Sequence, residues 1–571
     1  MHRRASRPTS LVIGLMAAAI LGCSGPSAPT PTRSETAPSQ AAPSVPQKAL
    51  HIAFATEPPV LDRTLGGGSG VYDWSAFLSG YLTYTNFDAK PALYLAAELP
   101  TVERGTWKVM PDGTMETTYK LKPNALWHDG KPVVARDFVF ANRIRADPAI
   151  PATLQEVESR IGRVVAVDDQ TLFIEWKVPY IWAGMISMPN YAPMPSHLLE
   201  DLYQTDKTAF IDSPYWRTEF VGAGPYKLDR WEQGVEIALR AHDGFVLGKP
   251  KIDQIVIKFI TDANTIVANL LSGSADAAFH SSIGFPQNQA LQQAGWPGTL
   301  EYWRGNPRYF EFQTRDWGNL QRAVLDVRVR RALLHAIDRQ AIIDGLYSGK
   351  AMIIHFWLPL EDPAFPAVDR AVTKYDFDAP RAEALLRDAG WTKGPDGVAR
   401  NASGEALQLQ VLNESQDIDQ LEAAVVGDYW KAIGAGSEVL RITRQQQGDG
   451  EYRAKFSAVS YSRRTLDYET MGWTSVGVSS PENRWAGIAR NGYVNPTVDE
   501  LWTKALGTID ARAREPLFVG ALEAMTADAV VTPTHLQPRA MAYRSDLSGP
   551  KENIGNSGAL VWNIWEWRWT N

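Results

Sequence analysis

Cysteine is nearly absent from this chain, since Cys23 is the only one among 571 residues. One thiol cannot form an internal disulfide, so burial of apolar surface must hold the fold together. The chain also lacks apolar runs of about 20 residues, the length that a membrane-spanning helix requires. The apolar stretch from Leu11 to Leu21 is too short for that role.

Basic runs are also missing, and the formal net charge is -7. Removing the first 22 residues lowers it from -7 to -10, because three arginines and no acid leave. An acidic protein without Lys/Arg clusters is not expected to bind nucleic acid. With a hydrophobic content of 44%, the chain is predicted to be globular, and its length favours two or three domains.

Sequence motifs of common catalytic sites are absent too. We find no GxSxG elbow, no HExxH helix and no phosphate-binding GxxxxGK[ST] loop. His128 has no second His or Cys at ligand spacing, so neither a metal site nor a cofactor is predicted. The many carboxylates leave a glycosidase-like pair open, but the sequence favours a protein that is not an enzyme.

The N-terminus has the pattern of an export signal. Arg3, Arg4 and Arg7 precede the apolar stretch, which ends in Ile20-Leu21-Gly22-Cys23. This ending resembles a bacterial lipobox, in which the cysteine is acylated and becomes the first mature residue. We therefore predict a signal peptide over 1–22, a lipid anchor at Cys23 and an extracytoplasmic location. Residues 23–47, rich in Pro, Ser and Thr, are predicted to form an extended tether.

Aromatic residues are plentiful, with 20 Trp, 20 Tyr and 19 Phe. Most of them are expected in the core, although some rings suit the walls of a ligand cleft. Strand patterns alternate with helix patterns along the body, which indicates an α/β fold. Met115 to Leu121 is predicted to be a strand, and helices are predicted after Asp326 and Asp378 as N-caps. The three arginines Arg328, Arg330 and Arg331 are interpreted as a solvated helix face.

Four blocks, in a fixed order, resemble one known family. They begin at Tyr119 (YKLKPNALWHDGKP), Gly222 (GAGPY), Asp326 (DVRVRRAL) and Tyr375 (YDFD), and they continue to Trp391 and Gly397. Together they resemble the large extracytoplasmic solute-binding proteins of peptide and nickel ABC importers, family 5. The resemblance covers the chain from about residue 50 to its end.

The resemblance implies a two-lobed periplasmic-binding-protein fold of type II, in the large class with an extra domain inserted in the first lobe. The first lobe would take residues 48–85, 206–307 and 496–571. The inserted domain would be 86–205, and the second lobe would be 308–495. Lobes of this kind close over a ligand by hinge motion. The partners implied are a small-molecule or peptide ligand and an ABC permease with its ATPase, with the binding protein itself a monomer.

The expected cleft departs from the family pattern at one place. Peptide-binding members hold the peptide's α-amino group with a carboxylate that follows an aromatic residue in the second lobe. Here the matching stretch has Arg463 and Arg464, and the nearest acid is Asp467. A guanidinium suits a carboxylate or phosphate in two-pronged contact. Pairing of these arginines with Asp467 or Glu469 is the alternative, and a peptide ligand stays open through Asp467.

The candidate ligand-binding residues combine a glycine-rich loop, aromatic rings and the two arginines. They are Gly67, Gly68, Ser69, Tyr309, Trp357, Tyr461, Arg463, Arg464, Trp473 and Trp485. The solute stays undefined among peptides, oligosaccharides, opine-like conjugates and nickel chelates. The alternative functions are an exported lipid-anchored hydrolase and a ligand-sensing receptor on the same fold.

Overall fold

The computed structural model describes most of the chain from residue 48 onward. The described residues are 48–65, 71–88, 90–111, 114–151, 157, 160–186, 188, 191–279, 282–413, 417–464, 466, 473–485, 487–553 and 560–570. The predicted signal peptide, lipobox and tether lie outside these residues. Residues 47–571 form one compact unit.

One large mixed sheet runs through this unit, and it has 11 strands among the described residues. Its first half follows the order β12-β1-β11-β10-β9, in which β1 pairs in parallel with both β11 and β12. These strands are β1 (Leu50–Phe54), β9 (Tyr226–Glu232), β10 (Glu236–Ala241), β11 (Gln254–Phe259) and β12 (Ala277–Phe279). Their alternating apolar residues face a core of buried Ile and Leu side chains.

The second half of the sheet has three parallel strands in the order β18-β17-β19. They are β17 (Gln408–Asn413), β18 (Gly436–Arg441) and β19 (Val459–Arg463), and the short β14 (Met352–Ile353) pairs with β20. Parallel strands need helical crossovers, and α12 (Asp417–Ala432) supplies the connection between β17 and β18.

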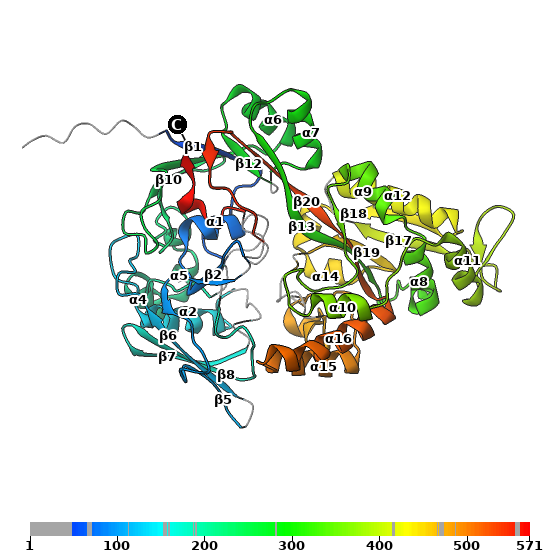
Figure 1. The fold of residues 1–571 in the computed structure, drawn as a ribbon, viewed down its shortest axis with the longest axis horizontal. Coiled ribbons are helices and arrows are strands. Elements are labelled where there is room, and N and C mark those ends of the chain that lie inside the picture. The colour runs from blue at the N-terminus through cyan, green and yellow to red at the C-terminus, as the bar shows by residue number, and fades with distance from the viewer. Residues whose placement is uncertain are drawn as a thin grey trace, which may run out of the picture. The chain divides into compact units, whose positions relative to one another are not determined.

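Two long antiparallel strands join the halves: β13 (Thr299–Phe312) and β20 (Val531–Tyr543) (Figure 1). The start of β13 pairs with the end of β20, which pairs with β12 of the first half. The end of β13 pairs with β19 of the second half. Between these regions the β13–β20 register shifts, from Arg304 opposite Pro538 to Pro307 opposite Leu536. A bulge bends and twists a ribbon locally, and we call this position of the crossover strands the hinge.

The hinge bulge requires glycine at its tightest point. A Cβ atom on Gly305 would lie 2.1 Å from the backbone oxygen of Gln537. The next residue, Asn306, accepts a hydrogen bond of 2.7 Å from the Arg539 guanidinium on β20. Glycine therefore lets the two crossover strands approach each other at the position where their register changes.

A separate sheet lies within the predicted inserted domain, which we call the inserted region, and has the order β4-β6-β8-β7 with β5 against β6. Its strands are β4 (Ala96–Glu98), β5 (Trp107–Val109), β6 (Met115–Leu121), β7 (Ile161–Asp168) and β8 (Thr171–Trp176). The small pairs are β2 (Thr83–Thr85) with β3 (Pro91–Leu93), β15 (Thr392–Lys393) with β16 (Ala399–Arg400), and β21 (Leu547–Ser548) with β22 (Arg568–Trp569). The strand predicted over 115–121 is confirmed.

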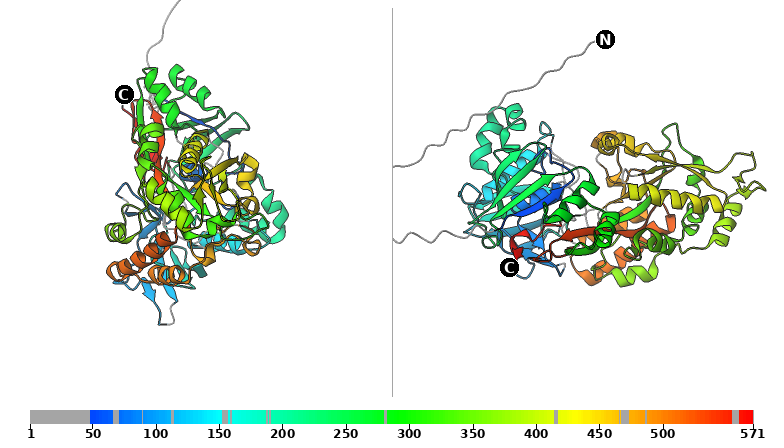
Figure 2. Two further views of the ribbon diagram at one scale, coloured as in Figure 1. Left: turned by 90° about the vertical axis from the view of Figure 1, so that its right-hand side faces the viewer. Right: turned by 90° about the horizontal axis from the view of Figure 1, so that it is seen from above.

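The helices pack against these sheets from both faces (Figure 2). Those before β13 are α1 (Val71–Leu78), α2 (Ala135–Ala146), α4 (Ser196–Thr205), α5 (Lys207–Ile211), α6 (Ala263–Ser272) and α7 (Phe285–Gln293). After β13 come α8 (Val327–His335), α9 (Arg339–Tyr347), α10 (Phe365–Ala371), α11 (Ala379–Asp388), α13 (Arg444–Gly448), α14 (Gly450–Ala454), α15 (Pro496–Gly507) and α16 (Ala511–Asp528).

Local capping explains where several helices begin. The side chains of Asp326 and Asp378 accept backbone hydrogen bonds from Arg328 and Arg381, so both predicted N-caps are confirmed. In the inserted region, the Trp127 indole donates to Asp137 at 3.0 Å and packs beneath the turn at Gly130, which has φ of 85°. Glycine adopts this left-handed conformation without steric cost.

The interpretation of the α8 arginines as a solvated face is wrong for Arg330. Its guanidinium is buried and donates to the Asp528 carbonyl, and Arg331 donates to the Ala527 carbonyl. Both carbonyls lie at the carboxyl end of α16, where helix carbonyls lack intrahelical partners and attract cations. These arginines therefore fasten α16 to α8.

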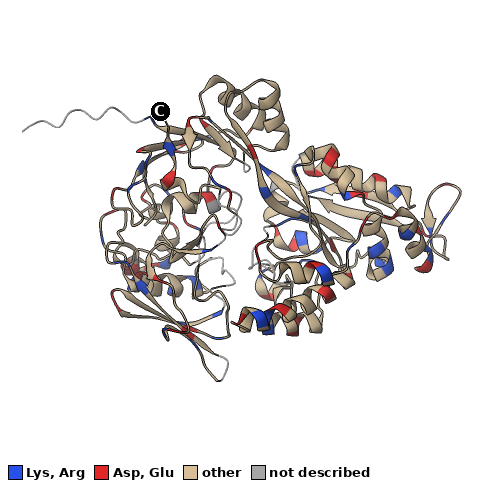
Figure 3. Ribbon diagram, viewed as in Figure 1, with Lys and Arg blue, Asp and Glu red and all other residues tan. Residues whose placement is uncertain are grey.

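Packing also differs from the predicted lobe boundary at residue 496. Trp502 of α15 and Phe518 of α16 belong to the same buried cluster as Tyr309, Trp357 and Val368. These two helices therefore pack with the second half of the sheet, and the chain returns to the first half only within β20. Figure 3 shows acidic and basic residues interspersed along the ribbon of both halves.

Candidate functional site

The parallel strands β17, β18 and β19 all end at one edge of the sheet, at Asn413, Arg441 and Arg463. In open α/β sheets, ligands bind outside the carboxyl ends of the strands, where the strand order changes direction. The antiparallel β13 and β20 run beside β19 at this edge, with Arg308 opposite both Arg463 and His535. The edge therefore lies next to the hinge.

A fully buried ion pair anchors this edge. The Nε atom of Arg308 on β13 donates to Glu422 of α12 at 2.9 Å, and neither side chain has any exposed surface. The guanidinium also lies 3.9 Å from the centroid of the Tyr461 ring, a cation–π contact. Two buried charges are tolerated only when they compensate each other and their remaining polar atoms are hydrogen-bonded.

Glu422 is both paired with a cation and hydrogen-bonded at its carboxylate. It accepts a hydrogen bond of 2.6 Å from the Tyr461 hydroxyl, and its Oε1 lies 3.1 Å from Nε2 of His535. The Tyr347 hydroxyl donates at 3.4 Å. Burial by itself raises the pKa of Glu422, but Arg308, His535 and Tyr461 outweigh burial and lower that pKa to about 2. Glu422 is thus a permanent anion.

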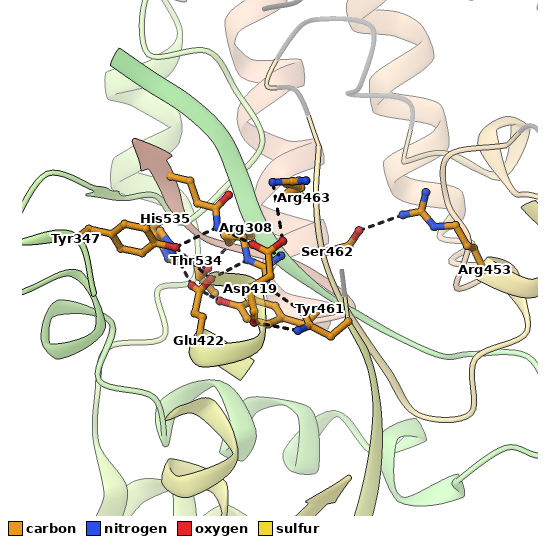
Figure 4. A network of polar contacts seen from close by, with 12 residues as sticks. Arg308, Tyr347, Asp419, Glu422, Arg453, Tyr461, Ser462, Arg463, Thr534 and His535 are labelled. Carbon is orange, nitrogen blue, oxygen red and sulfur yellow. Dashed lines mark hydrogen bonds and ion pairs between the residues drawn. The ribbon is translucent and has the colours of Figure 1, made fainter. Parts of the chain in front are cut away.

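Asp419, one helical turn before Glu422, is less completely bonded. Its Oδ1 accepts a hydrogen bond of 3.0 Å from Gln537 and lies 3.7 Å from Nη1 of Arg308. Its Oδ2 lies 3.8 Å from Nη1 of Arg463 and accepts no hydrogen bond from the described residues. Figure 4 shows the Asp419 carboxylate directed between these two guanidinium groups.

Helix geometry explains why both acids are buried. Asp419 and Glu422 extend the stripe of α12 that continues through the buried Ala423, Val426 and Trp430. Residues spaced by three or four share one helix face. The only sign of this network in the sequence is that two acids fall on the buried face of a helix. The sequence analysis did not predict either acid as a site residue.

The opposite face of β13 carries an aromatic cluster with a buried acid. Tyr309 packs against Trp357 and Trp473 with ring centroids 5.0 and 5.6 Å apart. Glu311, two residues on, is buried and accepts a hydrogen bond of 3.2 Å from the Arg490 backbone. Burial raises the pKa of Glu311, whereas Arg490, Arg453 and Arg464 lower it.

The predicted site residues fall into three groups. Tyr309, Trp357, Tyr461 and Trp473 are at most 1% exposed, so they support the edge from beneath in this structure. Arg463 is 17% exposed at its side chain, and Arg464 and Trp485 are also partly exposed. Gly67, Gly68, Ser69 and Asp467 lie outside the described residues. Their contact with a solute stays a prediction.

Trp485 joins a second, more accessible aromatic group. Its ring centroid lies 5.7 Å from that of Trp317, and the Lys455 ammonium lies 5.3 Å from both centroids. Arg484 and Trp485 have φ of 54° and 62°, a left-handed conformation that costs non-glycine residues energy. The structure thus separates Trp485 from the Tyr309 cluster that holds Trp357 and Trp473.

The described residues contain neither a group of side chains suited to a metal ion nor a membrane-spanning helix. No three or more His, Cys, Asp or Glu side chains in that part of the chain are grouped to hold a metal ion. Within the same residues, no helix has both the length and the apolar character needed to cross a membrane.

Two sheet halves joined by long crossover strands, with a polar edge beside the hinge, define a hinged binding protein. The chain belongs to the bacterial extracellular solute-binding proteins, family 5, because the model of the middle part of that family matches residues 101–488. Proteins of this family are extracytoplasmic components of ABC transporters, of the peptide and nickel type. Both the predicted family and the predicted two-lobed fold are confirmed.

Curated relatives span nearly the whole chain. Protein XP55 of Streptomyces lividans is 28% identical over 84% of this chain and 81% of its own length. The oligopeptide-binding protein AppA of Bacillus subtilis is 22% identical over 89% and 90%. Among solved structures, NikZ of Campylobacter jejuni, in complex with Ni(L-His), aligns with a TM-score of 0.74 and 22% identity, covering 92% of this chain and all of NikZ.

Proposed function

We propose that this protein captures a small extracytoplasmic solute between its two halves and delivers it to the permease of an ABC importer. One observation carries the proposal: the polar edge formed by Arg308, Asp419 and Arg463 lies beside the bulge where β13 and β20 join the halves. A solute bound there contacts both halves when the hinge bends. Binding and movement are thus coupled through adjacent residues.

Closure sets a requirement on binding energy. If the free protein is about 99% open, a solute must favour the closed state by about 5.5 kcal/mol to make it about 99% closed. A two-pronged contact with a guanidinium, together with stacking on one or two rings, provides energy of this order. A single hydrogen bond does not provide that much energy.

The direct test is to identify what the protein carries. Solute released by denaturing freshly purified protein is identified by mass spectrometry, and it is then added back to refolded, emptied protein. We expect one-to-one binding by calorimetry and a smaller radius of gyration in X-ray scattering. The proposal fails if the released solute neither rebinds nor changes the dimensions of the protein.

The two alternative functions, a hydrolase and a sensing receptor, predict different experimental results. A hydrolase would return its ligand cleaved, whereas a binding protein returns it unchanged. The relative AppA is described as an oligopeptide-binding protein. A sensing receptor would bind a signalling partner in place of a permease. Uptake of the identified solute by cells that lack this gene separates import from sensing.

Attachment and domain organisation complete the proposal. Acylation at Cys23 would hold the body on the membrane through the tether over 23–47, as a monomer close to the permease. Growth with labelled palmitate and a Cys23→Ser variant tests the anchor, because only the parent protein should carry the label.

The division into a first lobe, an inserted domain over 86–205 and a second lobe stays part of this proposal.

A further inference from the structure

A single arginine pairs with two carboxylates at the hinge. Arg304 on β13 is the last residue that pairs with β20 before the register shifts, and the ladder resumes at Pro307. Its Nη1 atom donates to Glu361 at 2.7 Å, and its Nε atom donates to Glu552 at 3.4 Å. The backbone N–H of Arg304 donates to the same Glu552 oxygen at 2.5 Å. The side chain therefore holds both carboxylates at once.

The two carboxylates belong to different halves of the sheet. Glu361 lies in the loop after β14, and Trp357 of this loop is buried in a cluster of the second half. Glu552 follows Lys551, whose carbonyl accepts a 2.9 Å hydrogen bond from Trp562 in the core of the first half. The bulge lies between the halves, so a change in its bend moves the two carboxylates relative to each other.

These ion pairs are accessible to water, unlike the buried pair four residues further along β13. The side chains of Arg304, Glu361 and Glu552 are 36%, 28% and 26% exposed. Those of Arg308 and Glu422 have no exposed surface. A buried pair is costly to break because each charge then lacks both partner and water, whereas partly exposed charges exchange a partner for water. The Arg304 pairs can therefore form and break while the buried pair stays intact.

We propose that Arg304 is an ionic latch of the hinge, which stabilises the bend of this structure by holding Glu361 and Glu552 together. This inference rests on the hinge motion of the proposed function and specifies contacts that control it. A guanidinium has donors on both of its edges, so Nη1 and Nε serve different carboxylates at the same time. Bending that separates the carboxylates breaks one pair and leaves the other.

Distances between the halves test the latch without any solute. Nitroxide labels are attached to emptied protein through Val235→Cys in the first half and Leu325→Cys in the second, in a Cys23→Ser background. Both native side chains are exposed. Pulsed electron paramagnetic resonance gives the distribution of label distances. We expect Glu361→Gln to change the ratio of the populations about two- to fivefold, which is the strength of exposed ion pairs.

Glu361→Arg is a stronger test, because it places a second cation beside Arg304. It should shift the distance distribution further than Glu361→Gln. The same charge reversal in an Arg304→Gln background should leave the distribution of that background unchanged. Glu500→Arg is the matched control, since Glu500 forms an exposed pair with Lys504 within one helix of the second half.

Salt distinguishes the latch from a change in packing. Raising NaCl from about 20 to about 500 mM screens exposed charges, so it should shift the parent as Glu361→Gln does and leave Glu361→Gln itself unchanged. Circular dichroism confirms that each variant is folded. Identical distributions for the parent and Glu361→Arg overturn the proposal, as does a shift that persists without Arg304 or that Glu500→Arg reproduces. Solute release and rebinding would then still stand, so this failure differs from a failure of the proposed function.

Discussion

At the scale of single residues, the buried charges drawn in Figure 4 determine how well the protein tolerates substitution. The Arg308 side chain has no exposed surface, and Glu422 is the only acid among the described residues that accepts a hydrogen bond from it. Such pairs contribute little net stability compared with an apolar core, but the loss of one partner leaves a charge buried alone. The network is therefore intolerant of single substitutions.

Glu422→Gln should lower the free energy of unfolding by about 3–5 kcal/mol, because Arg308 would lose its hydrogen-bonded carboxylate and keep only that of Asp419, 3.7 Å away. Denaturation by guanidinium chloride measures the change. Lys504→Ala is the matched control, since Lys504 forms an exposed pair with Glu500 at 2.5 Å. Exposed pairs contribute at most about 0.5 kcal/mol in helices. A loss for Glu422→Gln as small as that of the control would contradict the structural role of the network.

His128 predicts a dependence of stability on pH. Its Nδ1 accepts a 3.0 Å hydrogen bond from the Gly222 backbone, so the neutral ring carries its proton on Nε2, 3.2 Å from the Gly224 carbonyl. Burial lowers the pKa of His128 well below its ordinary 6.5, and the neighbouring His242, Lys227 and Arg240 lower it further. The unfolded chain therefore binds a proton near pH 6.5 that the folded protein rejects.

Stability should be constant above about pH 6.5 and fall below it, by up to about 1.4 kcal/mol per pH unit for this one group. His128→Asn retains an acceptor for Gly222 and cannot titrate. Urea denaturation between pH 5 and pH 8 should show a shallower decline for this variant than for the parent. Parallel pH profiles would show that His128 does not contribute.

At the scale of elements, the crossover strands depend on one glycine. Gly305→Ala would place a methyl group 2.1 Å from the Gln537 oxygen, so the strands must separate there. We expect a loss of about 1–3 kcal/mol in unfolding free energy. Solute affinity should also weaken, because the bulge lies beside the edge that we propose binds the solute.

Gly345→Ala is the control for this substitution, because nothing lies within 4 Å of its Cβ position in α9. It should stabilise the protein by up to about 1 kcal/mol through helix propensity. Equal effects of the two substitutions on stability and solute binding would show that close approach at the bulge is unimportant.

Local patterns allowed several elements to be predicted, whereas the site required knowledge of contacts between distant segments. The strand at 115–121 and the caps at Asp326 and Asp378 follow from alternation and capping within a few residues. The network joins β13, α12, β19 and β20, segments more than 100 residues apart in places. Arg463 was selected as a candidate because it departs from a family pattern, and its contact with a solute stays a prediction. Asp419 was not selected, because an acid on a helix is usually solvated.

At the scale of the whole molecule, the halves meet at a second place besides the hinge. The Ile181 backbone of the inserted region donates to the Leu506 carbonyl of α15 at 3.1 Å, and Ile181 packs in the cluster that contains Trp502. Because α15 packs with the second half, this contact connects the inserted region to it. The contact is a second connection between the halves, besides the crossover strands.

A disulfide across this contact should trap the halves together. A Cβ on Gly507 would lie 3.3 Å from Cβ of Pro179, close to the spacing of disulfide partners. In a Cys23→Ser background, oxidised Pro179→Cys/Gly507→Cys should bind solute at least about tenfold more slowly, and dithiothreitol should restore the rate. Stopped-flow fluorescence measures it, and each single cysteine variant is the control. An unchanged rate after complete oxidation would contradict closure at this contact.

The pairing of β13 with β20 also fixes when the protein can fold. Strand β20 ends at Tyr543, close to the end of the chain, yet it supplies the central ladder of both halves. During synthesis more than 200 residues are added between β13 and its partner β20. A similar length separates β1 from its partners β11 and β12. Such distant pairing slows folding, so the growing chain remains without its central sheet until β20 has been made.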